Sequence, residues 1–514
     1  MAQVIIFADT SRPGIWLRGI GPYSLATHIR QYGYTVEVID FISGFGYDDF
    51  SKLIEKFCGP ETQMVGVSST WITADRWSTD IKNTFGEGDQ APLFFDKDRH
   101  STYYDSFSWA LTTKTHQRFF DKIRKHAPNA KLIVGGVRAI DFAEHGFDKV
   151  MLGYSENQII DLLDKRRIIT ETIINHDIKG EIGDFDFGSS KTMFTPSDFL
   201  LEDETLPIEI GRGCIFKCKY CSFPLIGKKK LSYLKEAESL KTELLFNWEH
   251  FRIRRYIIID DTFNDSLDKL RYLADIIDTL PFRPQFWCFA RLDLITINRE
   301  QIELLHRIGV KEVQFGIESF NPASAKAVGK GLGPDIKKDT LYAIKEYWKD
   351  DVRTKCSFII GLPHETSETI QTHYEWLLKP DCPVDAAGIN PLFLSQPDKY
   401  QSYRWNSYFD LHYEEYGYYF ENPTHHFDWK KKDNTDIDSF VKAYSLYKHW
   451  TPLLGKNGRP ISEQFYHANT KKLGLTFEEL LDDEKFIHAK YHIDWKSLYF
   501  DQVKHLYVER KLNC

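Results

Sequence analysis

Three cysteines lie close together in this 514-residue chain, at Cys214, Cys218 and Cys221. Their C-x3-C-x2-C spacing brings three thiolates onto one short segment. A 4Fe–4S cluster that only transfers electrons is normally held by four cysteines. Three thiolates would hold three of the four irons and leave the fourth iron open to a small molecule. The segment therefore predicts a cluster that can bind and activate a ligand.

A zinc ion or a disulfide framework would be another use of these cysteines. Structural zinc takes four ligands, usually as paired cysteines or histidines, and the sequence offers no second pair. Eight cysteines in 514 residues are also too sparse for a disulfide framework. The remaining cysteines lie singly, at Cys58, Cys288, Cys356, Cys382 and Cys514. These observations favour the iron–sulfur cluster.

The composition limits the classes of protein to which the chain can belong. Its length suggests about three domains, and its 42% hydrophobic content is sufficient for buried cores. A formal net charge of −8 argues against a protein that coats nucleic acid. The sequence contains neither a signal peptide nor an apolar run of about 20 residues. We expect a cytoplasmic protein without membrane association.

The N-terminal third alternates apolar runs with helical segments. Helices are expected over residues 23–32 and 157–165, and Gly33 is expected to end the first of them. This alternation predicts a doubly wound parallel sheet in an α/β domain. Residues 71–113 are too long for an ordinary loop and suggest a functional insertion or lid. The strands are expected at residues 4–8, 35–40, 64–69, 131–136 and 149–153.

The middle third contains a second series of strands and helices. Active sites of (β/α) barrels lie at the carboxyl ends of their strands, and the cysteine segment directly follows the first strand of this series. Amphipathic spacing predicts helices over 264–279 and 298–308. Cys288 and Cys356 fall inside strands, where we expect small buried apolar residues. The strands are expected at residues 206–211, 255–260, 286–290, 312–316, 355–360 and 386–393.

From about residue 395 the alternation stops, and we expect a mainly helical, aromatic-rich region. Its clustered tyrosines between residues 413 and 420 suit a packed core or the lining of a substrate site. His425 and His426 are expected at the surface, and so is Cys514. The predicted organisation is an α/β domain at 1–190, a partial (β/α)6 barrel at 191–394 and a C-terminal region at 395–514.

The cysteine spacing, with Tyr220 directly before the third cysteine, resembles the radical S-adenosylmethionine (radical SAM) superfamily. In that superfamily SAM chelates the open iron through its amino and carboxylate groups, and an injected electron splits the sulfonium to give a 5′-deoxyadenosyl radical. The resemblance covers most of residues 1–400 and includes the partial barrel. It implies a 4Fe–4S cluster on Cys214, Cys218 and Cys221, SAM as a cofactor, and a low-potential electron donor such as flavodoxin or ferredoxin.

The resemblance also implies which strand ends bind SAM. Arg291 is a candidate partner of the SAM carboxylate, since a guanidinium fork matches a carboxylate. The turn that starts at Gly361 resembles a Gly-Leu-Pro-Gly-Glu-Thr turn, with His364 in place of the usual glycine. The candidate SAM-binding residues are Tyr220, Asp260 and Asp261 (amino-group segment), Arg291, Glu318 and Ser319 (ribose-contacting strand) and Gly361.

The N-terminal domain resembles the Rossmann-like cobalamin-binding domain of one large radical SAM class. The D-x-H-x-x-G motif of cobalamin domains has a counterpart in residues 9–14, where Ser11 replaces the cobalt-ligating histidine. Cobalamin-dependent radical SAM enzymes commonly lack that histidine. The alternative is a domain that kept the fold without the cofactor, or that binds the substrate. The candidate cobalamin-binding residues are Ser11, Ser68, Gly135, Gly136 and Gly153.

These observations predict a radical SAM enzyme that acts on an unidentified small molecule, with cobalamin-dependent methyl transfer as one outcome. An RNA methylthiotransferase-like enzyme is an alternative, but such enzymes carry three further cysteines in their N-terminal domain, where this chain has only Cys58. A cobalamin or redox binding protein without catalysis is a second alternative. The open iron argues against it.

Overall fold

The computed structural model describes two α/β units and a C-terminal region. The predicted insertion at 71–113, Ser11, the His425-His426 pair and Cys514 lie outside the described residues. The described residues are 1–9, 17–42, 47–69, 116–165, 170–175, 185–200, 204–223, 233–394, 400–403, 406–421, 429–432, 435–456, 507 and 509–513.

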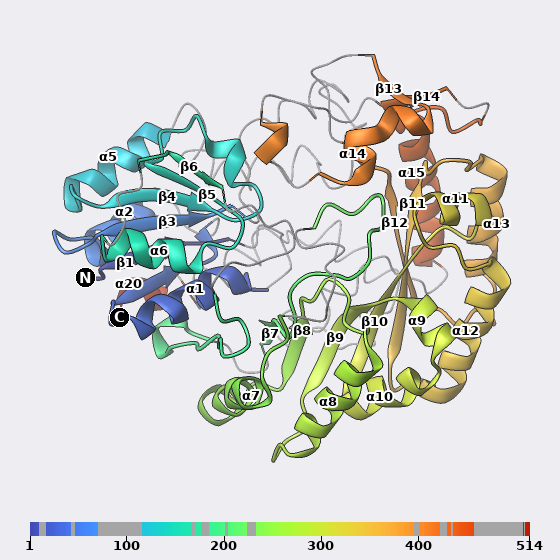
Figure 1. The fold of residues 1–514 in the computed structure, drawn as a ribbon, viewed down its shortest axis with the longest axis horizontal. Coiled ribbons are helices and arrows are strands. Elements are labelled where there is room, and N and C mark those ends of the chain that lie inside the picture. Colours follow the sequence, from blue (N-terminus) through green and yellow to red (C-terminus); the bar gives the residue numbers. More distant parts are fainter. Residues whose placement is uncertain are drawn as a thin grey trace.

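The first sheet has six parallel strands in the order β2-β1-β3-β4-β5-β6 (Figure 1). Five of them coincide with the five predicted strands. The sixth, β6, was not predicted, because a strand of three residues is too short to show a periodic pattern. The strands are β1 (Val4–Phe7), β2 (Val36–Ile39), β3 (Met64–Ser68), β4 (Lys131–Gly135), β5 (Lys149–Leu152) and β6 (Ile173–Asn175).

Helices cover both faces of this sheet, as a doubly wound fold requires. Successive strand residues point to opposite faces, so Ile6 packs in the core beneath α1 (Ile20–Gln31) and α6 (Glu156–Leu163). Phe7 packs in the opposite core, beneath α2 (Tyr47–Phe57) and α5 (His116–His126). Gly33 follows α1 with a φ of +86° and ends the helix as predicted.

The second sheet also has six parallel strands, in the order β12-β11-β10-β9-β8-β7. Each coincides with a predicted strand to within a few residues, which confirms the partial barrel. The strands are β7 (Thr205–Ile208), β8 (Arg255–Ile258), β9 (Gln285–Ala290), β10 (Val310–Glu318), β11 (Arg353–Ile360) and β12 (Ala386–Pro391).

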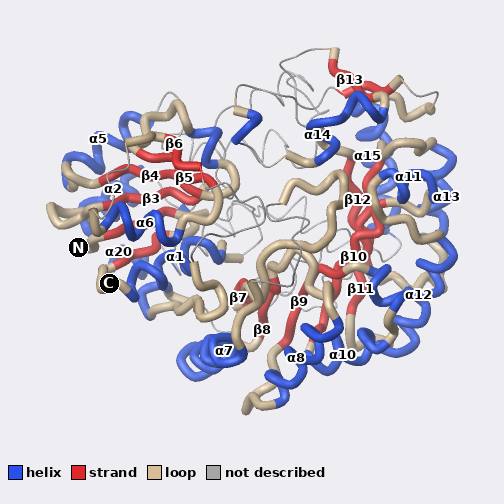
Figure 2. The backbone as a smooth tube through the Cα atoms, in the orientation of Figure 1, coloured by secondary structure: helices blue, strands red, loops and turns tan. Residues whose placement is uncertain are grey.

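The helices between these strands all lie on the outer side of the curved sheet, and its other side faces the first unit (Figure 2). The predicted helices over 264–279 and 298–308 correspond to α8 and α10. The helices are α7 (Ala237–Phe251), α8 (Leu267–Asp278), α9 (Leu292–Ile297), α10 (Glu300–Ile308), α11 (Pro322–Ala327), α12 (Pro334–Trp348) and α13 (Ser367–Leu377).

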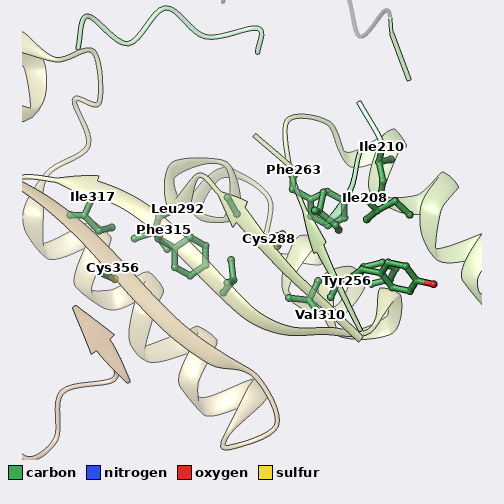
Figure 3. Packing of buried hydrophobic residues seen from close by; sticks show 14 of the residues in the cluster. Ile208, Ile210, Tyr256, Phe263, Cys288, Leu292, Val310, Phe315, Ile317 and Cys356 are labelled. Carbon is green, nitrogen blue, oxygen red and sulfur yellow. The ribbon is translucent and has the colours of Figure 1, made fainter. Parts of the chain in front are cut away.

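A continuous apolar core fills the space between the second sheet and its helices (Figure 3). Phe315 on β10 and Tyr256 on β8 are almost completely buried there. Cys288 and Cys356 are 0% exposed in the same core, which confirms the prediction that both are small buried apolar residues. Because these thiols lie on the helix side of the sheet, they are separated from the cysteine segment by the strands themselves.

The C-terminal region departs from the mainly helical prediction at one place. The strands β13 (Tyr418–Phe420) and β14 (Trp429–Lys431) form a small antiparallel sheet. It follows α14 (Tyr408–His412) and precedes α15 (Phe440–Lys456), which packs on β12. Among the described helices, none combines the length and the apolar character that crossing a bilayer would require.

The last described residues return to the first sheet. Helix α20 (Glu509–Asn513) packs beside α2, and the two chain ends lie near each other (Figure 1). Tyr507 is 0% exposed, and its hydroxyl accepts a hydrogen bond from the backbone N–H of Asp40 at 2.9 Å. Lys511 forms a buried ion pair with Glu37. The C-terminal segment is thus part of the core of the N-terminal unit.

Candidate cofactor site at the cysteine loop

The cysteine loop begins at a strand end that is held by a buried carboxylate. Asp260, which follows β8, is 3% exposed. Its Oδ1 accepts hydrogen bonds from the backbone N–H groups of Ile210 and Gly211, both at 2.9 Å. Its Oδ2 accepts one from Lys269 Nζ at 2.9 Å. Asp260 therefore fixes the first residues of the loop, a role that the sequence did not predict.

The three thiols are reduced and partly shielded from solvent. Cys214 is buried and lies 3.2 Å from the hydroxyl of Thr262, while Cys218 and Cys221 are half-buried. Burial raises the pKa of Cys214 and raises that of Cys221 to about 12, and the nearby charge of Asp261 adds to both shifts. Thiols in such surroundings ionise when they bind a metal.

The described residues contain no three metal-binding side chains that converge on one ion. A single zinc ion needs such convergence. A 4Fe–4S cluster instead takes one thiolate per iron, so its ligands stand apart around the cubane. Cys214, Cys218 and Cys221 lie on one loop, where each thiolate could bind a separate iron of such a cluster.

Arg291 lies directly against the cysteine loop. Its Nη1 is 3.0 Å from Cys218 Sγ, and its guanidinium carbon lies 3.9 Å from the ring centroid of Phe216. The remaining nitrogens donate to the carboxylate of Asp293 at 2.9 and 2.5 Å. A positive charge beside a ligand sulfur would stabilise the thiolate. In the structure the guanidinium fork of Arg291 thus binds the carboxylate of Asp293. Binding of the SAM carboxylate by Arg291 stays a prediction.

Tyr220, Glu318 and Lys330 form a hydrogen-bonded group at the carboxyl end of β10. Glu318 Oε1 accepts from the Tyr220 hydroxyl at 2.6 Å and from Lys330 Nζ at 2.8 Å. A side chain at Gly316 would collide with both Glu318 and Lys330, so glycine leaves the space in which the pair lies. Glu318 itself adopts a φ of +63°, in the left-handed region. The sequence predicted Tyr220 and Glu318 but missed Lys330.

The turn after β11 keeps the shape that glycine would give it. His364 adopts a φ of +67° where the family turn has glycine. Glu365 Oε2 accepts from the backbone N–H of Gly361 at 2.9 Å, and its Oε1 accepts from the Ser319 hydroxyl at 2.8 Å. Ser319 and Gly361 thus belong to one buried network. Asp261 is half-buried beside the loop, and the SAM contacts proposed for all three stay predictions.

Gly361→Ala should destabilise the protein by about 3 kcal/mol. Gly361 has a φ of +95°, and a Cβ there would lie 2.8 Å from Trp429 Cη2. Gly331→Ala is the matched control, because a Cβ at Gly331 meets nothing within 4 Å. Urea unfolding of the metal-free variants measures both effects. Equal midpoints for the two variants would refute the packing argument.

The buried carboxyl of Glu365 makes stability depend on pH. Burial raises its pKa from 4.5 to about 7, partly offset by hydrogen bonds from Ser319, Gly361 and Leu362. A raised folded-state pKa contributes stability that is complete below pH 4.5 and is lost as the pH rises through 7. The loss amounts to about 3 kcal/mol. Glu365→Gln, which cannot ionise, should lack this component when urea midpoints are compared at pH 5 and 7.5; parallel pH profiles would contradict the assignment.

The C-terminal region reaches the cysteine loop. The backbone N–H of Phe409 donates to the Lys219 carbonyl at 2.9 Å, and Lys219 Nζ donates to the Tyr416 hydroxyl at 2.5 Å. Tyr418 is 1% exposed and donates to the Gly361 carbonyl at 2.6 Å. The clustered tyrosines are thus divided: Tyr418 is core, and Tyr416 supports the loop.

The cobalamin candidates share one edge of the first sheet. Ser68 and Gly135 are register partners at the carboxyl ends of β3 and β4. Gly136 and Gly153 follow β4 and β5 with φ values of +101° and +83°. Open α/β sheets bind ligands at this edge. The structure brings four of the five candidates together, and Ser11 lies outside the described residues.

A comparison with protein-family models identifies one domain of the chain. The radical SAM superfamily model matches residues 208–377. This range contains the three cysteines and most strands of the partial barrel. These residues are a radical SAM domain, which confirms the resemblance found in the sequence. Such a domain uses a 4Fe–4S cluster and SAM, and it requires a reductant and a substrate.

Several known proteins are similar to this chain. It is 29% identical over 172 residues to an uncharacterized methyltransferase of Pyrococcus horikoshii, covering 33% of this chain and 36% of that protein. It is 20% identical over 240 residues to the bacteriochlorophyllide d C-12(1)-methyltransferase of Chlorobaculum tepidum, covering 43% and 51%. It is 26% identical over 195 residues to the ribosomal protein uS12 methylthiotransferase RimO of Psychrobacter arcticus, covering 34% and 35%. The chain thus spans about half or less of these relatives.

One solved structure has the same fold over most of the chain. The radical SAM methyltransferase TsrM from Kitasatospora setae, with cobalamin and a 4Fe–4S cluster bound, superimposes with a TM-score of 0.53. The match covers 77% of this chain and 73% of that chain at 15% identity. The likeness extends to both sheets and establishes the shared architecture.

Proposed function

We propose that the protein is a cobalamin-dependent radical SAM enzyme that transfers a methyl group to a small molecule. The observation that carries this proposal is the loop with Cys214, Cys218 and Cys221, which lies at the carboxyl edge of a parallel sheet. Of the other described cysteines, Cys288 and Cys356 are buried on the helix side of the sheet, away from this loop. The TsrM architecture and the methyltransferase relatives support the choice of reaction.

The residues around the loop would bind and orient the cofactors. When bound and reduced by a donor such as flavodoxin or ferredoxin, the cluster supplies the electron that cleaves SAM. Arg291 would stabilise the Cys218 thiolate, and the Tyr220–Glu318–Lys330 group would present polar atoms to the SAM ribose. The packed C-terminal residues around Tyr416 would exclude water from the loop, which radical chemistry requires.

SAM cleavage tests the radical SAM part of the proposal. With an electron from dithionite, anaerobically reconstituted protein should cleave SAM to 5′-deoxyadenosine and methionine, or, if SAM serves only as a methyl donor, should transfer its methyl group to added cob(I)alamin and release S-adenosylhomocysteine. Absence of both products from protein that contains about four irons per chain would contradict the proposal. Protein without added iron and sulfide is the control.

Corrin binding tests the cobalamin part. The edge formed by Ser68, Gly135, Gly136 and Gly153 supports it, because small residues allow a flat ligand to approach the backbone. Protein purified anaerobically after growth with hydroxocobalamin should show a stoichiometric corrin absorption band. An active enzyme without a corrin absorption band would indicate an N-terminal domain that kept the fold without the cofactor.

A methylthiotransferase is the second candidate, because RimO proteins are among the relatives. Those enzymes need a second cluster in the N-terminal domain. Cys58 is 2% exposed and is the single cysteine in residues 1–190 of the sequence, so this domain cannot supply the three thiolates of a second cluster. Iron analysis separates the candidates: about four irons per chain support the proposal, and about eight would revive the methylthiotransferase.

A further inference from the structure

Arg212, which precedes the cysteine loop, connects the two sheets. Its Nη1 forms an ion pair with Glu156 Oε1 at 2.8 Å, and Glu156 is the first residue of α6 in the N-terminal unit. Its Nε and Nη2 donate to the two oxygens of Glu209 at 2.8 and 3.1 Å, and Glu209 directly follows β7. Arg212 is 5% exposed. Its guanidinium thus joins carboxylates from both units in a buried position.

Aromatic rings enclose the same guanidinium. Its central carbon lies 4.4 Å from the ring centroid of Tyr154, 4.7 Å from that of Phe187 and 5.3 Å from that of Phe185. Tyr154 belongs to the loop between β5 and α6, and the two phenylalanines belong to the segment that connects the units. Arginine stacks well on aromatic faces. Arg212 therefore contacts the first unit, the connection and the barrel.

The charges at this junction depend on one another. Arginine cannot lose its proton in a protein, so the buried guanidinium needs its carboxylates. Glu156 is 8% exposed, and its Oε2 has no hydrogen-bond partner among the described residues. Removing one member of a buried ion pair leaves the other charge uncompensated. Breaking the Arg212–Glu156 pair would thus leave a buried uncompensated charge at the contact between the units.

We propose that Arg212 is a positioning residue that fixes the loop at residues 153–156 against the cysteine loop. A ligand held at the carboxyl edge of the first sheet then faces the cluster at a set distance and orientation. That this ligand is a corrin rests on the proposed function. The link between the two loops does not depend on the identity of the ligand.

Two matched variants test the proposal in the full-length, cluster-reconstituted protein. Glu156→Gln and Glu209→Gln each remove one negative charge from the same guanidinium without changing side-chain size, but only Glu156 bridges the units. Glu156→Gln should raise hydrogen–deuterium exchange in residues 153–160 and 211–221 at least about tenfold. Glu209→Gln should leave exchange in residues 153–160 within about twofold of the unsubstituted protein.

The electron spin–spin coupling between the two cofactors reports their distance and orientation. In protein loaded with cob(II)alamin and a reduced cluster, Glu156→Gln should weaken the electron spin–spin coupling, while iron content and SAM cleavage persist. Equal exchange in residues 153–160 for the two variants, or loss of iron in both, would overturn the proposal. If the unsubstituted protein binds no corrin, the cobalamin function fails, and the exchange comparison still decides whether Arg212 positions the loop.

Discussion

Cys218→Ala is expected to abolish both cluster assembly and SAM cleavage. Iron should fall from about four per chain to near zero, because two thiolates cannot retain a cubane. The loss of 5′-deoxyadenosine should exceed the about 10- to 100-fold that follows removal of an outer-shell partner. Arg291 Nη1, now 3.0 Å from the Cys218 sulfur, would lose this contact as well. Iron and sulfide analysis and product chromatography measure these effects.

Cys288→Ala is the matched control for this variant. It removes the same thiol group from a completely buried site on the helix side of the sheet. The variant should lose about 1 kcal/mol of stability to the small cavity and keep its iron. Retention of full iron by Cys218→Ala, or loss of iron by Cys288→Ala, would show that the cluster ligands have been misassigned.

Asp260→Ala is expected to destabilise the protein by about 3–5 kcal/mol, because it breaks a buried ion pair with Lys269 and strips two backbone N–H groups of their acceptor. The donors belong to Ile210 and Gly211, at the start of the cysteine loop, so iron content should fall too. Thermal and urea unfolding of the metal-free chain give the stability, and iron analysis gives the effect on the loop.

Asp260→Asn separates this structural role from the predicted role in binding the SAM amino group. Asparagine retains an acceptor for the two N–H groups, and Asp265 still lies 3.2 Å from Lys269 Nζ. The variant should therefore regain most of the iron. A variant with normal stability and iron but a strongly raised KM for SAM would instead favour direct contact between Asp260 and SAM.

The fold was largely predictable because every strand of the two sheets except β6 carries its own local pattern. β7 to β12 are short apolar runs separated by amphipathic helices, and the sequence places all six. β6 and the β13–β14 pair were missed, since strands of three residues contain no period to recognise. Gly33 was predictable because a positive φ at a helix end is a local property.

The site was most predictable where the residues that bind a cofactor lie in one short segment of the sequence. The three cysteines and Tyr220 fall in one segment. Lys330 was missed, because its partner Glu318 lies twelve residues away and no local pattern links the two. Arg212 and Glu156 are far apart in the chain, and nothing in either neighbourhood indicates the other. Asp260 was predicted as a cofactor ligand, whereas its observed partners come from the preceding strand end.

The docking of Tyr507 and Lys511 on the first sheet has a consequence for dissecting the molecule. The predicted boundaries at residues 190 and 394 suggest three pieces that could be produced separately. A fragment ending near residue 190 would lose the ring that covers Phe41 and the lysine that pairs with buried Glu37. It would expose an apolar patch and an unpaired carboxylate to water, so co-expression with the C-terminal residues is the better route to a soluble N-terminal unit.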